Sequence, residues 1–279
     1  MNILIIGGSR FVGPFLIQRL LKYGHNITVL NRGNYKIQDH RVTQIKHDRN
    51  QGFSLNEKFD VVADMCAYNG LHTQAAVTQL KFDHFVHFST AAVYKKTDSF
   101  PLTENSPLGD WPVWGEYNKG KVECEAALER SDISYATIRP VYILGPRNYV
   151  DRERFIYSKI KNGQTINLPG DGGARVQFVF VNEVASLFAK IIENKITGSF
   201  NCCGDDIVTL KQLVEVMGKI VGKQPKILIT NKELPESEFP FANETFFCSN
   251  HKAKSLGIKF GSLKTNLLRD YLAYYKGAI

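Results

Sequence analysis

The first thirteen residues place the strongest constraint on the fold of this chain. Residues 2–6 form a short apolar run that leads into a glycine-rich turn, Gly7-Gly-Ser-Arg-Phe-Val-Gly13. Residues 12–23 then carry apolar side chains at helical spacing. Glycines let the backbone approach a pyrophosphate closely, and the start of a helix presents free N–H groups. This order of strand, turn and helix predicts a dinucleotide-binding site.

The remaining pattern predicts an α/β protein in which strands and helices alternate, as in a doubly wound parallel sheet. We expect a Rossmann-type core over residues 1–145, to which 174–203 return, and a small C-terminal substrate-binding lobe built mainly from 146–279. The strands are expected at 2–6, 26–31, 42–46, 59–64, 84–89, 135–139, 175–181 and 198–203. The helices are expected at 12–23, 70–81, 116–130, 151–162, 183–194 and 209–222, the last opened by Thr209, with a turn-rich stretch over 163–173.

Composition constrains the ligands and the cellular location expected for the protein. The formal charge is +8, but the basic residues are spread along the chain, which favours at most a mild bias towards phosphorylated ligands. The apolar runs are strand-sized, so no membrane span is expected, and no secretory signal is visible. The five cysteines form no C-x-x-C pair, which predicts a reducing, cytoplasmic location. His47, His84 and His87 lack a ligand cluster, so no metal site is predicted.

Two further segments point to acid–base chemistry. Thr90 follows the strand expected at 84–89, and Tyr117 and Lys121 are spaced to share one face of the helix at 116–130. A lysine one turn from a tyrosine lowers the phenol pKa electrostatically and can hold a cofactor ribose. Together with the upstream turn, these residues predict a catalytic set in which Tyr117 is the acid–base and Thr90 orients the same substrate oxygen.

On these motifs the chain resembles the extended short-chain dehydrogenase/reductase superfamily, in its NAD-dependent epimerase/dehydratase branch. The resemblance implies cofactor contacts from the glycine turn, from Asp48 at the adenine, and from Lys121 and Pro140 near the nicotinamide. It also implies that homodimers are common among relatives. The complete set of cofactor residues implied here is Gly7, Ser9, Arg10, Phe11, Val12, Gly13, Asn31, Arg32, Asp48, Cys66, Ala67, Tyr68, Lys121 and Pro140.

The chain departs from the family pattern at two cofactor positions. Arg10 replaces the middle glycine of the turn, as in atypical members related to chloroplast stem-loop RNA-binding proteins. Asn31 and Arg32 stand where NAD-preferring members have an acidic residue, which would repel a 2′-phosphate. These departures favour NADP(H) over NAD(H), although Asn31 can still bond an unphosphorylated ribose.

The resemblance also implies the substrate class. The segment 169–185 is similar to one in which nucleotide-sugar enzymes grip the diphosphate with an arginine, here Arg175. Thr90 and Asn148 are the other predicted substrate residues. Further candidates for the sugar pocket are Trp111, Trp114, Tyr149 and Tyr157, each of which can equally be ordinary packing or surface.

The sequence therefore predicts an NAD(P)-dependent epimerase or 4-keto reductase that acts on a nucleotide-activated sugar. Dehydratases of the family have an Asp-Glu pair after the catalytic threonine, whereas this chain has Ala91 and Ala92. Two other functions stay open. One is an RNA-binding protein on this scaffold, motivated by the basic charge and Arg10, and the other is a dinucleotide sensor that turns nothing over.

Overall fold

A seven-stranded parallel sheet forms the larger part of the computed structural model, which describes residues 1–279. The strand order is β10-β6-β5-β4-β1-β2-β3, and every neighbouring pair runs parallel. This arrangement confirms the predicted Rossmann-type sheet. Its strands are β1 (Asn2–Ile6), β2 (Asn26–Asn31), β3 (Val42–Lys46), β4 (Lys58–Asp64), β5 (Lys81–Phe88), β6 (Tyr135–Pro140) and β10 (Gly198–Cys202).

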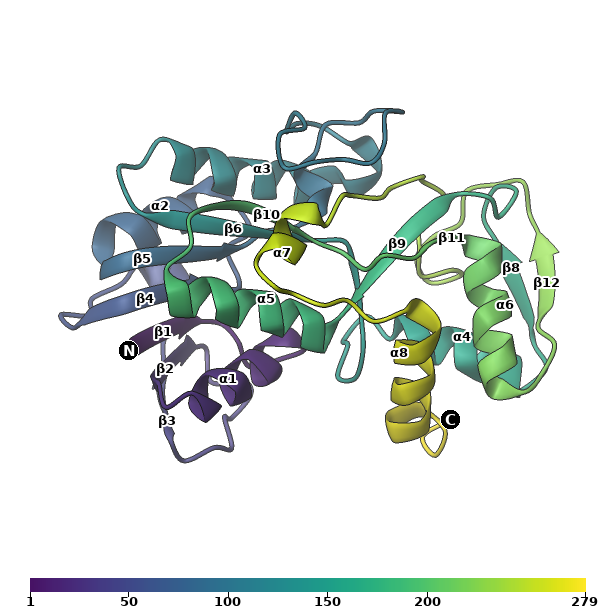
Figure 1. Ribbon diagram of the computed structural model, residues 1–279, viewed down its shortest axis with the longest axis horizontal. Helices are drawn as coiled ribbons and strands as arrows, with labels where there is room; N and C mark the ends of the chain where they lie inside the picture. The colour runs from purple at the N-terminus through teal and green to yellow at the C-terminus, as the bar shows by residue number, and fades with distance from the viewer.

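Helices cover both faces of this sheet (Figure 1). α1 (Val12–Lys22) and α5 (Val181–Asn194) pack on one face, and α2 (Gly70–Gln79) and α3 (Gly115–Glu129) pack on the other. In β1, Ile3 and Ile5 join the core beneath α1 and α5, whereas Leu4 and Ile6 join the core beneath α2 and α3. Burial on both faces explains why the strand is apolar without alternation.

A smaller lobe has its own hydrophobic core of 20 buried residues. It contains a three-stranded sheet of β7 (Tyr142–Leu144), β9 (Arg175–Phe180) and β11 (Ile207–Thr209). Parallel β8 (Thr165–Leu168) and β12 (Lys226–Ile229) form a second sheet. The helices are α4 (Arg152–Lys161), α6 (Leu210–Val221) and α8 (Leu263–Asp270), followed by a π-helical turn at Tyr271–Tyr275. The Thr209 side chain accepts from the Gln212 N–H and so caps α6, as the sequence predicted.

The connections between core and lobe are more interleaved than the sequence suggested. Within 174–203, β10 belongs to the main sheet and α5 packs on that sheet. β9, in contrast, pairs with β7 and β11 in the lobe. The segment 163–173, expected to be rich in turns, also includes β8, which the sequence did not predict because its partner β12 lies far along the chain and leaves no local pattern. Near the C-terminus, α7 (His251–Ser255) returns from the lobe to pack beside β10.

The carboxyl ends of the main-sheet strands point towards the smaller lobe (Figure 1). β1 lies between β2 and β4, so the chain order reverses at β1 and the crossovers diverge to opposite faces. Ligands of open α/β sheets bind in the crevice at this position. Three short 3₁₀ turns complete the edge that faces it: Arg49–Gln51, Ala91–Val93 and Pro112–Trp114.

One buried histidine makes the stability of the sheet sensitive to pH. His87 on β5 is fully buried, and neither ring nitrogen has a hydrogen-bond partner. Burial, followed by the positive charge of Lys121, lowers the pKa of His87 to about 3. In the unfolded chain the pKa returns to about 6.5. Between these values the unfolded state binds more protons, so acid favours unfolding.

We therefore expect the free energy of unfolding to decrease as the pH falls below about 6.5, with His87 contributing up to about 1.4 kcal/mol per pH unit. The substitution His87→Leu removes this contribution and should flatten the dependence between pH 6.5 and about 4. Urea unfolding of both proteins at several pH values measures it. An unchanged slope in the variant would contradict the assignment.

Candidate functional site

Two adjoining clefts open at the carboxyl edge of the main sheet. The turn cleft, about 430 Å³, lies around residues 7–12 and the ends of β2 and β4. The lobe cleft, about 520 Å³, lies between the end of β5, the start of α3 and the smaller lobe. The residues that line both clefts are Phe11, Met65, Tyr68, Phe88 and Tyr149. A ligand bound in the turn cleft can therefore extend to the groups of the lobe cleft.

The glycine turn has the geometry of a phosphate cradle. Gly7 and Gly8 have φ of 91° and 69°, and a Cβ added to Gly13 would lie 2.0 Å from the Gly8 carbonyl oxygen. Only glycine permits this close approach of the helix start to the turn. No side chain caps the first turn of α1, where Phe11 is the N-cap residue. The N–H groups of residues 8–12 have no hydrogen-bond partner in the protein, so the turn and the start of α1 suit an anionic ligand.

The structure brings most of the predicted cofactor residues together. The turn cleft is lined by Gly7, Ser9, Arg10, Phe11, Val12, Asn31, Arg32, Asp48, Cys66 and Tyr68. Gly13 and Ala67 do not line the turn cleft, and Ala67 is fully buried. Lys121 and Pro140 line the lobe cleft instead. Sequence reasoning missed further lining residues, namely Gly8, Tyr35, His47, Arg49, Asn50 and His72.

Asn31 and Arg10 are both engaged at the mouth of the turn cleft. The Asn31 amide donates to Ser9 Oγ over 2.7 Å, and its Oδ1 accepts from Gly33 N and Gln44. The Arg10 guanidinium lies between two aromatic rings, 4.8 Å from the centroid of Tyr35 and 4.6 Å from that of Tyr149. Because Tyr149 belongs to the segment that leads into the lobe, Arg10 bridges the glycine turn and the lobe.

A buried ion pair holds the floor of the turn cleft. Arg49 donates to both carboxylate oxygens of Asp64, over 2.8 and 2.9 Å, and also to the His72 carbonyl. Burial alone raises the pKa of Asp64, but the charge and hydrogen bonds of Arg49 outweigh it and lower the pKa. The pair ties the turn after β3 to the end of β4 and the start of α2. Only the three-dimensional contact reveals it.

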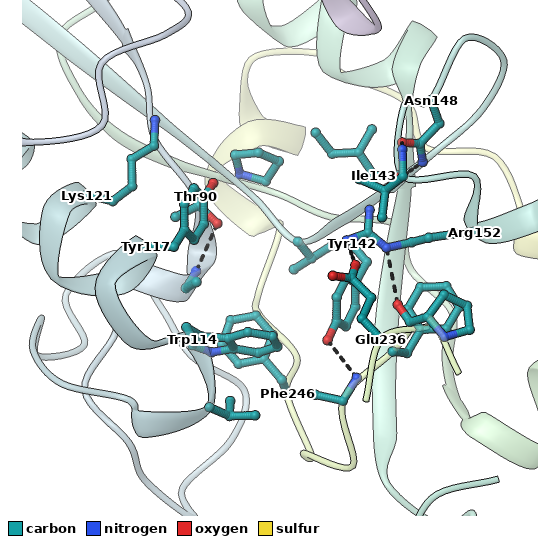
Figure 2. Close-up of a pocket in the computed structure, with 18 of the residues that line it drawn as sticks. Thr90, Trp114, Tyr117, Lys121, Tyr142, Ile143, Asn148, Arg152, Glu236 and Phe246 are labelled. Atoms are coloured by element: carbon teal, nitrogen blue, oxygen red, sulfur yellow. Dashed lines mark hydrogen bonds and ion pairs between the residues drawn. The ribbon is translucent and has the colours of Figure 1, made fainter. Parts of the chain in front are cut away.

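Thr90, Tyr117 and Lys121 meet in the lobe cleft, as the sequence predicted (Figure 2). Thr90 follows β5 and its hydroxyl accepts from Ala92 N, while Tyr117 and Lys121 lie one turn apart on α3. Lys121 Nζ donates to the Phe88 carbonyl over 2.7 Å and lies 5.5 Å from the Tyr68 ring centroid. The three side chains come from the two elements that border the junction of the clefts.

The electrostatics of Tyr117 differ from the sequence expectation. Desolvation raises the pKa of the Tyr117 phenol, and the Thr90 hydroxyl and the charge of Arg152 lower it in part. The charge of Lys121 is not among the causes of the Tyr117 pKa shift. Burial lowers the pKa of the Lys121 ammonium group itself. In this state the phenol is therefore protonated at neutral pH and suited to donate a proton. The tuning of Tyr117 by Lys121 stays a prediction.

A buried network fixes α3 against the sheet. Glu125 lies on the same face of α3 as Lys121 and accepts from Ser89 Oγ over 2.5 Å. It also accepts from Arg139 Nε and Nη2. Arg139, at the end of β6, further donates to the Tyr94 hydroxyl and the Glu104 carbonyl. Since Ser89 precedes Thr90, the network sets the position of Thr90 relative to α3.

The predicted substrate residues divide between the cleft and other places. Asn148 lines the lobe cleft, and its Oδ1 accepts from Val150 N. Arg175 lies outside the cleft: it is exposed, and its guanidinium covers the Phe247 ring at 4.9 Å. Trp114 and Tyr149 line the cleft, whereas Trp111 and Tyr157 are fully buried in the cores of the two parts.

Sequence reasoning also missed the far wall of the lobe cleft. This wall carries an arginine, Arg152, among aromatic residues that come from distant segments of the chain. Figure 2 shows Arg152, Tyr142 and Glu236 across the cleft from Thr90 and Tyr117. No repeated spacing in the sequence links these residues, because β7, α4 and the 234–246 segment meet only in the folded lobe.

No group of three or more His, Cys, Asp or Glu side chains in the structure is placed to hold a metal ion. All five cysteines are free thiols, and four of them are buried. His84 bonds Ser134 inside the sheet, and His47 bonds the Gly52 carbonyl. Both histidine side chains are therefore hydrogen-bonded within the protein scaffold.

Comparison with known proteins places the chain in a family. The sequence model of the NAD dependent epimerase/dehydratase family matches residues 71–203. The chloroplast stem-loop binding protein of 41 kDa b from Arabidopsis thaliana is 32% identical over 91% of this chain and 73% of its own length. The chain belongs to the NAD dependent epimerase/dehydratase family. This membership confirms the resemblance seen in the sequence.

Three further matches have lower sequence identity to this chain. UDP-glucuronic acid decarboxylase 4 from Arabidopsis thaliana is 22% identical over 81% of this chain, and the chain spans only 59% of its length. Two solved structures share the fold over the full length of both chains. They are a Bacillus cereus UDP-glucuronic acid 4-epimerase in complex with UDP-glucuronic acid and NAD, with TM-score 0.77 and 19% identity, and a Thermotoga maritima UDP-glucose 4-epimerase with UDP-glucose, with TM-score 0.78 and 17% identity.

None of the helices has both the length and the apolar character needed to cross a membrane. The homodimer and the cytoplasmic location expected from the sequence stay predictions.

The buried network around Glu125 yields a stability prediction. Glu125→Gln leaves the Arg139 cation buried without its counter-charge, so we expect a loss of about 3–5 kcal/mol in the free energy of unfolding. The matched control is Glu116→Gln on the same helix, where the pair with Lys119 is exposed and should contribute less than about 0.5 kcal/mol. Urea unfolding measures both. Equal effects of the two substitutions would contradict the assigned role of Glu125.

Proposed function

We propose that this family member is an NAD(P)-dependent enzyme that epimerises or reduces a nucleotide-activated sugar. The observation that carries the proposal is the meeting of Thr90, Tyr117 and Lys121 in a cleft that shares a wall with the turn cleft. A binding module has no need for this acid–base set. The relatives and structural neighbours include UDP-sugar epimerases and decarboxylases, which supports a UDP-sugar as the substrate.

The residues present fit a nicotinamide dinucleotide. Gly13 has no side chain to hold the helix away from the turn, and the start of α1 has no side-chain cap, so there are space and N–H donors for a diphosphate. The N–H groups of residues 8–12 would hold that diphosphate, Asn31 and Arg32 would face a ribose, and Asp48 the adenine. Lys121 would hold the second ribose. A bound nicotinamide dinucleotide supplies hydride transfer, and the protein supplies position and polarity.

The chain's own residues perform the proton chemistry. Tyr117 donates its phenolic proton to the sugar oxygen when a ketone is reduced and takes a proton back when an alcohol is oxidised. Thr90 bonds the same oxygen and orients it. The positive charge of Arg152 favours the tyrosinate. Reduction uses the protonated form that the structure favours.

Tyr117→Phe tests this role. The substitution keeps the ring and removes the proton, so we expect turnover of a UDP-sugar substrate to fall roughly 100- to 10,000-fold, with the Kd for the cofactor nearly unchanged. The control Tyr23→Phe alters an exposed tyrosine at the C-terminal end of α1 and should leave turnover unchanged. Product formation by NMR and cofactor binding by calorimetry provide the two readouts. Full activity of Tyr117→Phe would refute the proposal.

RNA binding is a second candidate, because the relative with 32% identity is named a chloroplast stem-loop binding protein. It predicts affinity for an RNA stem-loop that falls steeply with salt and does not respond to cofactor. A dinucleotide sensor predicts cofactor binding with no turnover of any sugar. The same preparations therefore separate the three functions.

We also propose that NADP(H) is preferred over NAD(H). Arg10 lies at the mouth of the turn cleft beside Tyr35, and Arg32 lies next to the expected ribose position. No acidic side chain stands at the end of β2 to repel a 2′-phosphate.

Arg10→Met tests this preference. Removing the cation should weaken NADPH binding about tenfold, because a hydrogen bond to a charged group contributes about 1.5–3 kcal/mol. The Kd for NADH should change less than about twofold. Arg41→Met, at an exposed arginine beside Asp39, is the control. Equal weakening of NADPH and NADH would instead place Arg10 on the shared diphosphate.

A further inference from the structure

We propose that Arg152 binds a carboxylate on the sugar itself, so that the substrate is a nucleotide-activated uronic acid. This inference rests on the function proposed above and narrows its substrate class.

Arg152 is the available cation of the lobe cleft. The charged residues that line this cleft are Lys121, Arg152 and Glu236. Lys121 is buried and already donates to the Phe88 carbonyl. The Arg152 side chain is 18% exposed, and no carboxylate lies within hydrogen-bond distance of its guanidinium. A partly buried guanidinium in an apolar wall is completed by a planar anion such as a carboxylate.

The protein holds the Arg152 guanidinium in a defined orientation. It lies 5.5 Å from the Tyr142 ring centroid and 5.8 Å from that of Phe241, and Nε donates to the Pro240 carbonyl over 3.3 Å. Two aromatic rings and one backbone oxygen therefore fix the plane of the guanidinium. Apart from the long contact of Nη2 with Glu236, the terminal nitrogens have no partner in the protein, and Figure 2 shows the Arg152 side chain across the cleft from Thr90 and Tyr117.

A carboxylate of the chain itself already approaches this position. Glu236 Oε1 lies 3.7 Å from Arg152 Nη2, which is too long for a hydrogen bond, and the Glu236 side chain is 65% exposed. A weak, solvated contact of this kind is easily exchanged for a ligand carboxylate. Glu236 thus shows which chemical group the site attracts.

The position of Arg152 favours the sugar over the diphosphate. Its charge acts on the phenol of Tyr117, which is the group expected to face the reacting hydroxyl. In a hexuronic acid the carboxyl group is attached to C5, next to C4, whereas the diphosphate is attached to C1 across the ring. If C4 reacts at Tyr117, the carboxylate is the nearer anion.

Calorimetry on the cofactor-loaded protein tests the inference with UDP-glucuronic acid, UDP-glucose and UDP. The wild type should bind UDP-glucuronic acid about tenfold or more tightly than UDP-glucose, as expected for a charge-assisted hydrogen bond. Arg152→Met should abolish this difference and leave the Kd for UDP-glucose and UDP nearly unchanged. Arg154→Met, exposed on the same helix and paired with Asp151, is the matched control and should retain the preference.

A second variant probes the same site without removing Arg152. Glu236→Gln removes a competing negative charge, so UDP-glucuronic acid should bind more tightly while UDP-glucose does not. Equal weakening of all three ligands by Arg152→Met would place the arginine on the diphosphate and overturn the inference, as would an unchanged preference. Failure of the wild type to bind any UDP-sugar would overturn the proposed function itself and, with it, this inference.

Discussion

The close contact between Gly13 at the start of α1 and the carbonyl of Gly8 is the constraint on which the site depends. A Cβ at Gly13 would lie 2.0 Å from that oxygen, so any other residue forces the helix away from the turn. The contact holds the start of α1 against the glycine turn, where the N–H groups of residues 8–12 have no hydrogen-bond partner in the protein. The turn cleft, and everything positioned relative to a ligand in it, follows from this backbone geometry.

The second requirement is that α3 keeps its position on the sheet. α3 carries Tyr117 and Lys121, and the Glu125 network joins it to Ser89 at the end of β5 and to Arg139 at the end of β6. The lobe then closes the far side of the cleft, where Tyr149 reaches back to Arg10 in the glycine turn. The glycine turn, the group of Thr90, Tyr117 and Lys121, and the lobe wall of the cleft are thus linked by side-chain contacts.

Much of the Rossmann-type core was predictable, because its strands are buried on both faces and read as local apolar runs, and because the glycine turn and the Tyr117–Lys121 spacing are local motifs. The lobe was less predictable. β8 pairs with β12 from a distant segment, and Arg152, Tyr142 and Phe241 meet only after the lobe folds. Arg175 was expected in the cleft from a motif, but β9 pairs within the lobe sheet and turns this side chain towards Phe247.

The central claim is that the glycine turn and the start of α1 hold a nicotinamide dinucleotide. Calorimetric titration of the wild type and of Gly13→Ala with NADPH and NADH, after circular dichroism has shown both proteins to be folded, tests this claim most directly. We expect one bound dinucleotide per chain in the wild type and loss of that binding in the variant. Absence of binding by the wild type, or equal binding by Gly13→Ala, would contradict it.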